Sequence, residues 1–233
     1  MGILNFLFHL IEVLAAIAGT YFIFRNNRVK NDLKIFVYYL WLTVFVETLG
    51  VIPRLIDSFE AFDFLQTSLL SNTIWIYNFY LIITFVVYLF LFKEAIQTII
   101  FRRIILILKY LFLAISFVYF VYYNNLFGDF SSSLFILGSI FLLIAVMVYF
   151  FEILKSDTIL TFNKSIYFYI AVGALIFYLS MTPLFIFHKY YKNSVSPDFV
   201  KIYSLFRGIA IIFMYSCYTV GFILCLKKKK SYY

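Results

Sequence analysis

The sequence TVFVETLGVIPR, residues Thr43–Arg54, places a carboxylate, Glu47, inside an apolar segment and then interrupts that segment at Gly50 and Pro53. An ionised carboxylate within hydrocarbon raises the free energy by several kcal/mol unless a partner or a water-filled cavity stabilises it. Glu47 therefore indicates a site, which is either a structural ion pair or a binding position.

The chain around this stretch has the composition of an integral membrane protein. Of its 233 residues, 65% are hydrophobic and 13% are charged, whereas soluble domains are about half apolar and about a quarter charged. A membrane-spanning helix takes about 20 mainly apolar residues. Seven stretches qualify: Ile3–Phe24, Ile35–Ile52, Ile74–Phe92, Ile104–Tyr123, Leu134–Phe151, Ile166–Phe187 and Ile202–Leu226. They predict an all-α membrane protein in which residues 1–233 form a single bundle of seven transmembrane helices.

The basic residues orient this bundle, because cytoplasmic loops carry the excess of Lys and Arg. The loops after the first, third and fifth spans, together with the C-terminal tail, hold 13 of these residues, and the alternate loops hold 4. We therefore expect the N-terminus outside and the C-terminus in the cytoplasm, in the inner membrane of a bacterium. The net charge of +8 is explained by helix ends facing anionic lipid headgroups, so we expect no nucleic-acid partner.

The longest loop has a pattern of its own. Over residues 55–70, apolar positions recur at helical spacing with acidic residues on the opposite side. This pattern predicts a short amphipathic helix on the outer interface. An irregular acidic loop is the alternative.

Five polar residues fall at similar depth in the outer half of the predicted bundle: Glu12, Glu47, Asn78, Thr182 and Arg207. A rise of about 1.5 Å per residue places Glu47 and Arg207 about 8 Å inside, with Glu12 nearer the midplane. Since a guanidinium can satisfy two carboxylates, we expect Arg207 to pair with Glu47, Glu12 or both. This polar layer is a structural ion pair, a ligand or ion pocket open to the outside, or a proton relay.

The motifs of catalysis and metal binding are weak. His9 and Glu12 have i, i+3 spacing and could bind a metal with help from His188 or Glu47. Coordination would depend on carboxylates, because the chain has only 2 histidines, and we predict no metal site. No GxSxG, HExxH or P-loop motif occurs. We therefore expect no catalytic residue, no cofactor and no enzymatic activity.

A shift of 130 residues aligns the chain with itself at several positions without gaps. It places Lys34 on Lys164, Tyr39 on Tyr169, Pro53 on Pro183 and Tyr88 on Tyr218. This register maps spans one to three onto spans five to seven, with the fourth as a linker. Such a 3+1+3 parallel repeat resembles the SWEET and PQ-loop transporters, although the proline–glutamine dipeptide is absent. Chance matching is the alternative explanation.

Three stretches carry a wider resemblance: FRNNRVKNDLKIFVYYLWLTVFVETLG, YFFEILKSDTIL and SVSPDFVKIYSLFRGIAIIFMYSCYTVGF. Over nearly its whole length the chain resembles a family of small seven-helix inner-membrane proteins of Flavobacteria-type Bacteroidota, which implies the fold but no activity. Its plan is also similar to the seven-helix membrane regions that precede sensor kinases. We therefore expect a non-enzymatic sensory or accessory subunit that acts, within the lipid bilayer, through a membrane or cytoplasmic partner protein. The alternative is a small-solute or ion transporter that uses the polar layer.

Overall fold

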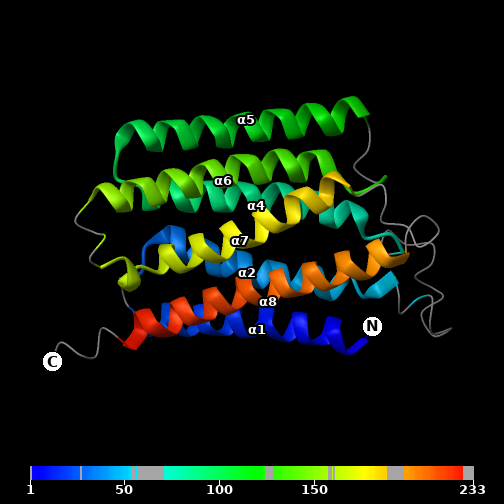
Figure 1. Cartoon of the computed structure of the whole chain (residues 1–233), viewed down its shortest axis with the longest axis horizontal. Coiled ribbons are helices and arrows are strands. Elements are labelled where there is room, and N and C mark those ends of the chain that lie inside the picture. Colours follow the sequence, from blue (N-terminus) through cyan, green and yellow to red (C-terminus); the bar gives the residue numbers. More distant parts are fainter. Residues whose placement is uncertain are drawn as a thin grey trace.

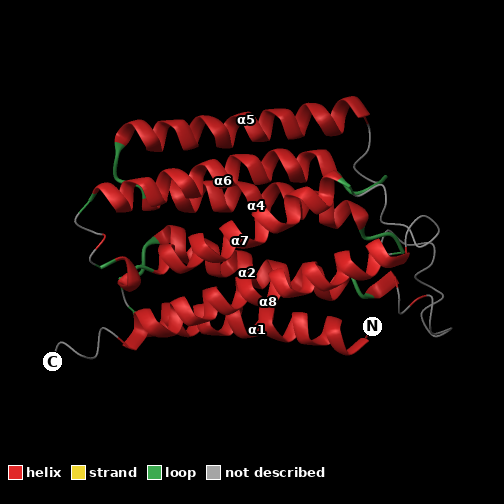
Figure 2. Cartoon of the chain, viewed as in Figure 1, coloured by secondary structure: helices red, strands yellow, loops and turns green. Residues whose placement is uncertain are grey.

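Long α-helices make up almost all of the chain in the computed structural model, which describes residues 2–26, 28–53, 56, 71–123, 128–156, 159, 161–187 and 197–227. Within these ranges there are seven α-helices, one 3-10 turn and no strand (Figure 2). The helices are α1 (Gly2–Arg25), α2 (Asn31–Leu49), α4 (Ile74–Ala95), α5 (Ile99–Tyr123), α6 (Ser132–Lys155), α7 (Ile166–Ile186) and α8 (Pro197–Lys227). The amphipathic segment predicted over residues 55–70 lies outside the described residues, apart from Ile56.

Each predicted span overlaps one helix, and the differences occur at the ends. α2 begins at Asn31 instead of Ile35, and α8 begins at Pro197 instead of Ile202. Proline is compatible with the first turn of a helix, and charged side chains can reach water from a terminal turn, so counting apolar residues underestimates helix length. All of these helices except α2 are long and apolar enough to cross a membrane. The protein is therefore a multi-pass membrane protein whose apolar helices contact the bilayer.

α2 differs because its 19 residues include three charged side chains, Asp32, Lys34 and Glu47. Asp32 is buried inside the bundle, and Glu47 is half-buried there. The opposite face of α2 is apolar and exposed, with Tyr38 and Phe45 prominent on it. α2 thus has a polar inner face and a face suited to lipid.

The contacts between the described helices join six of them into a ring, and the other, α5, lies outside it at the top of Figure 1. Around this ring each helix packs on the next, in the order α1, α2, α4, α6, α7 and α8. The ring closes because α8 packs on α1. α5 packs on α4 and α6 from outside, and only a narrow stripe of it, which includes Ile105, Phe112 and Ser116, is fully buried. Glu152 on α6 fixes the start of α5 by accepting backbone N–H groups from Gln97 and Thr98, at 2.6 and 3.1 Å.

The helix contacts follow the 130-residue shift. Adding 130 to the residue numbers brings α1 onto α6, α2 onto α7 and α4 onto α8. The contact between α1 and α2 then corresponds to that between α6 and α7, and the contact between α2 and α4 to that between α7 and α8. The contact between α1 and α8 corresponds to that between α6 and α4. Figure 1 shows the two sets of three as separate layers, one behind the other. The order α1, α2, α4 in one half of the ring thus corresponds to the order α6, α7, α8 in the other half.

Individual residues follow this relation only in part. Tyr88 and Tyr218, which the shift matches, are both fully buried, and so are Phe92 and Phe222. Tyr39 is buried, but the matched Tyr169 is only half-buried and donates its hydroxyl to the backbone oxygen of Asn163. The order of helix contacts thus repeats more fully than the burial of the matched side chains.

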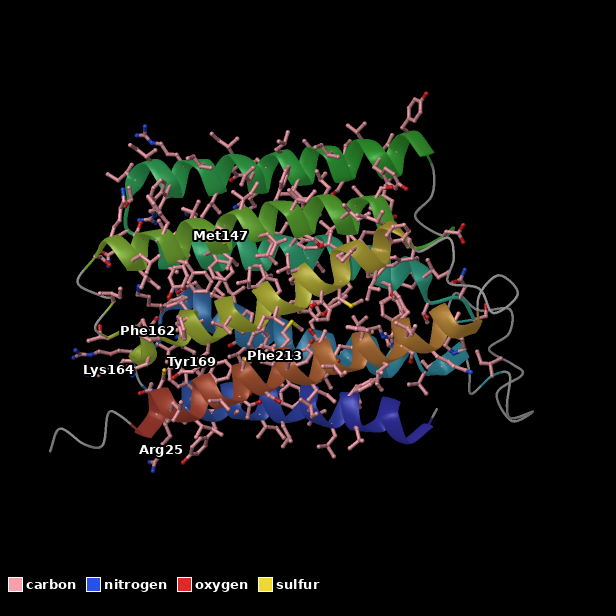
Figure 3. All side chains as sticks on the ribbon, viewed as in Figure 1. Arg25, Met147, Phe162, Lys164, Tyr169 and Phe213 are labelled. Atoms are coloured by element: carbon pink, nitrogen blue, oxygen red, sulfur yellow. The ribbon has the colours of Figure 1, made fainter. Side chains whose placement is uncertain are left out.

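The two ends of the bundle differ in charge. The end where α1 and α8 terminate carries Arg25, Lys93 and Lys155 in the last turns of their helices. Lys164 lies at the same end, as Figure 3 shows. We call this the basic end, and the end where α1 and α8 begin the N-terminal end.

Candidate functional site

A cavity lies inside the ring at its N-terminal end. Its wide part, about 480 Å³, is lined by residues near the helix ends, including the exposed side chains of Val51 and Arg207. Its narrow part, about 160 Å³, lies further along the ring and is lined largely by tyrosine, threonine and phenylalanine. Glu12, Glu47 and Ile211 are among the residues that line both parts. The two parts therefore adjoin each other, and the wide part reaches the N-terminal end.

Glu12 is the most buried charged group of this cavity. It projects from α1 and is only 5% exposed, because Ala15 and Ala16 on the same face bring the neighbouring helices close. Its Oε2 atom has no hydrogen-bond partner, and His9 Nδ1 lies 3.6 Å from it. His9 Nε2 in turn lies 3.3 Å from the hydroxyl of Thr48 on α2.

Glu47 lies on α2, two residues before the helix ends at Leu49. The hydroxyl of Tyr77 on α4 donates to its Oε2 atom at 3.4 Å. Gly50 makes this possible, since a Cβ atom at that position would overlap the Tyr77 hydroxyl. The interruption at Gly50 thus serves a close approach, and its backbone is in the ordinary right-handed region, with φ −64°.

Arg207 lies on α8 and lines the wide part together with both glutamates. Its guanidinium makes no direct ion pair with Glu12 or Glu47 in the part of the chain that the structure describes. The predicted pairing is thus wrong as a direct contact, because Arg207 is exposed near the end of the cavity while Glu12 is buried deeper. The structure brings these three residues together as charges around one space.

Asn78 and Thr182 do not line this space. Asn78 is fully buried, accepts the backbone N–H of Ser131 at 3.1 Å and donates to the carbonyl oxygen of Asp129 at 3.4 Å. It therefore holds the segment that leads into α6. Thr182 donates to the carbonyl of Tyr178 one turn earlier, at 2.6 Å. Depth along a helix placed both residues in the polar layer, but rotation about the helix axis directs them elsewhere.

The inner boundary of the cavity is a hydroxyl network that the sequence prediction did not include among the site residues. Tyr80 Oη lies 3.0 Å from Tyr39 Oη and 2.8 Å from Thr43 Oγ1. These residues and Thr84 line the narrow part, with Tyr178 and Tyr215 opposite. The available signal was the helical spacing of Tyr77, Tyr80, Thr84 and Tyr88, which put them on one face.

Beyond this network, contacts between the two sets of helices close the ring. The hydroxyls of Tyr88 on α4 and Tyr218 on α8 lie 2.6 Å apart, and Phe36 packs edge-on against both rings. Nearer the basic end, Tyr167 on α7 donates to Asp32 on α2 at 2.6 Å. Both contacts join helices that the 130-residue shift matches, α4 with α8 and α2 with α7, and they close the ring beyond the cavity.

From the sequence, His9 and Glu12 are possible ligands of a metal ion. No group of three His, Cys, Asp or Glu residues within the described ranges is arranged to hold a metal ion. His9 and Glu12 are adjacent, but His188, the other histidine, lies outside the described residues. What the cavity offers is carboxylates, hydroxyls and aromatic rings.

Comparison with known proteins gives no match to a protein-family model, a curated protein or a solved structure. Within the described residues, the fold and the cavity define the class: a helical, multi-pass membrane protein with a cavity that opens at one end of a six-helix ring and is lined by two glutamates and many aromatic side chains. The resemblance to small Bacteroidota membrane proteins stays a prediction.

Proposed function

We propose that the protein is a carrier for a small solute, with seven membrane-spanning helices and the cavity as its binding site. The observation that carries this proposal is the placement of the cavity inside a ring in which α1, α2 and α4 are followed by α6, α7 and α8, the correspondence that the 130-residue shift predicts. Carriers built from such repeats bind their substrates at the interface between the repeats, and rocking of one repeat against the other changes which side has access. The contacts of Tyr88 with Tyr218 and of Asp32 with Tyr167 would then form the closed side.

The proposal includes an orientation and a location. The basic end faces the cytoplasm by the positive-inside rule, so the cavity faces outward, and the membrane is the inner membrane of a bacterium. α2 counts as the seventh span because its charged residues face the interior while Tyr38 and Phe45 face lipid.

A sensory or accessory subunit is the second candidate, and one observation favours it. α5 packs mainly on two helices, α4 and α6, and exposes apolar side chains along its length, such as Ile107 and Phe117. This exposed face offers a partner protein a place to bind. In this case the cavity would hold a ligand without releasing it to the cytoplasm. The partner would carry the signal.

Flux and co-purification separate the two candidates. Purified protein in liposomes is tested for uptake of labelled cationic, zwitterionic, anionic and neutral solutes, and mild-detergent extracts are examined for a stoichiometric partner. Ile211→Trp would fill both parts of the cavity, whereas Ile212→Trp, the matched control, changes an exposed position on the same helix. A carrier gives uptake that Ile211→Trp abolishes and Ile212→Trp preserves. A stable partner with no uptake of any solute would contradict the carrier and favour the subunit.

A further inference from the structure

The unsatisfied oxygen of Glu12 indicates what the cavity binds. Glu12 Oε2 is buried, lines both parts of the cavity and accepts no hydrogen bond, and His9 Nδ1 at 3.6 Å is beyond hydrogen-bonding distance. A buried acceptor without a donor is unfavourable by the free energy of its lost hydration. A ligand that supplies an N–H donor would remove this penalty, because it would enter a space that Glu12 already faces.

The second carboxylate adds to the same requirement. Glu47 also lines both parts of the cavity, and the Tyr77 hydroxyl donates to it from the neighbouring helix. Each carboxylate can accept several donors. Two carboxylates facing one small space favour a ligand that carries positive charge and more than one N–H group.

The remaining walls are aromatic. Phe135 and Phe177 line both parts, and Tyr178 and Tyr215 line the narrow part. Ring faces attract organic cations and also accept apolar groups, so these walls suit both the charge and the body of an amine. Inorganic cations such as Na⁺ or Ca²⁺ need several oxygen ligands around one point, whereas the hydroxyls of the narrow part are already hydrogen-bonded to one another and to backbone carbonyls.

The guanidinium of Arg207 has a different place. Arg207 lines only the wide part and is exposed, so positive charge lies near the open end while negative charge lies deeper. An anion would have to stop at Arg207, because Glu12 and Glu47 would repel it from the narrow part. A cation is drawn past Arg207 by the two carboxylates.

We propose that the cavity binds a small organic ammonium ion, whose N–H groups donate to Glu12 and Glu47 while its apolar body packs among Phe135, Phe177 and Tyr215. This inference rests on the proposed function of the cavity as a solute-binding site and names its substrate class. A zwitterion that also contacts Arg207 is the competing ligand, and the test includes it.

The test measures binding to the purified full chain by calorimetry, with phenethylammonium as the probe. The matched ligands are 2-phenylethanol, which lacks the charge, 3-phenylpropionate, which reverses it, and phenylalanine, which is zwitterionic. We expect saturable binding of phenethylammonium that exceeds that of each matched ligand. Equal or tighter binding of the alcohol or the propionate would overturn the proposal, and tighter binding of phenylalanine would assign the cavity to zwitterions instead.

Variants connect the binding to the carboxylates. Glu12→Gln and Glu47→Gln should each weaken phenethylammonium binding by about tenfold or more, because a charge-assisted hydrogen bond becomes a neutral one. Glu94→Gln is the control, since Glu94 is ion-paired with Lys93 and Arg102 at the opposite end of α4. Thermal unfolding verifies that each variant is folded, and Glu12→Asp, which keeps the charge, should retain part of the affinity. Unchanged affinity in both glutamine variants would overturn the assignment.

Failure of this inference is distinguishable from failure of the carrier proposal. Phenethylammonium that binds in a Glu12-dependent manner but does not enter liposomes supports the ammonium site and contradicts transport. Uptake of another solute, with no ammonium binding, supports transport and contradicts the ammonium site.

Discussion

The contact between Tyr88 and Tyr218 can be tested by a double-mutant cycle. Their hydroxyls lie 2.6 Å apart in a fully buried position, and Tyr88 Oη also lies 4.0 Å from the sulfur of Met214. For Tyr218 Oη, Tyr88 is the only hydrogen-bond partner among the described residues. The two hydroxyls therefore depend on each other unequally.

This inequality sets the expected magnitudes. Tyr88→Phe leaves the Tyr218 hydroxyl buried without a partner, which costs about 2 kcal/mol of unfolding free energy. Tyr218→Phe costs about 1 kcal/mol, because the Tyr88 hydroxyl keeps its weak contact with Met214. The double variant leaves no unsatisfied hydroxyl and should cost about 1 kcal/mol, less than Tyr88→Phe alone.

The assay is reversible unfolding in mixed micelles, followed by circular dichroism, with Tyr38→Phe as the control. Tyr38 is 68% exposed on the outer face of α2, so its variant should unfold like the wild type. The reasoning is refuted if the two single substitutions are additive, because additivity means that the hydroxyls do not interact.

Three other substitutions test the walls and supports of the cavity. Gly50→Ala should lower the unfolding free energy by about 1–3 kcal/mol, because the added Cβ overlaps the Tyr77 hydroxyl. Adding Tyr77→Phe removes that hydroxyl and should recover part of the lost stability. No recovery would mean that the overlap is not the cause. Asp32→Ala should lower the unfolding free energy by about 1–3 kcal/mol, because it leaves the Tyr167 hydroxyl without its acceptor. Asp32→Asn keeps an acceptor and should cost less. Equal losses of stability for the two variants in thermal unfolding would contradict the hydrogen bond. Glu152→Gln should destabilise by about 1 kcal/mol and loosen the start of α5, because a charged acceptor of two backbone N–H groups becomes neutral. Hydrogen exchange at the first turn of α5 measures that loosening, and unchanged protection there would contradict the cap.

The helices could be predicted from the sequence because hydrocarbon imposes a length and a composition on every span. The spacing of Tyr39, Thr43 and Glu47, four residues apart, is that of one helical face, and the structure places all three on the wall of the narrow part. The ends were less predictable, as the start of α2 at Asn31 shows. Charged residues in a terminal turn interrupt an apolar run without ending a helix.

The neighbours of each helix could not be derived in this way. Depth alone placed Asn78 beside Glu47, but the rotation of α4 directs Asn78 to the segment before α6. The match of Tyr88 with Tyr218 was visible as one of several coincidences at a shift of 130 residues, whereas the hydrogen bond between them requires two helices on opposite sides of a ring. Such contacts depend on which helices meet, and periodicity within one helix carries no information about that.

The central claim is that a cavity lies between two sets of helices, open at the N-terminal end and closed toward the basic end. The most direct measurement is labelling of Ile211→Cys by a membrane-impermeant thiol reagent, in a chain whose Cys217 and Cys225 are replaced by serine. Intact cells expose the outer face, and inverted vesicles expose the cytoplasmic face. We expect labelling in intact cells, and in inverted vesicles only when Tyr88→Phe and Asp32→Ala together weaken the closure. Labelling of the otherwise unchanged Ile211→Cys chain from the cytoplasmic face alone would contradict the claim.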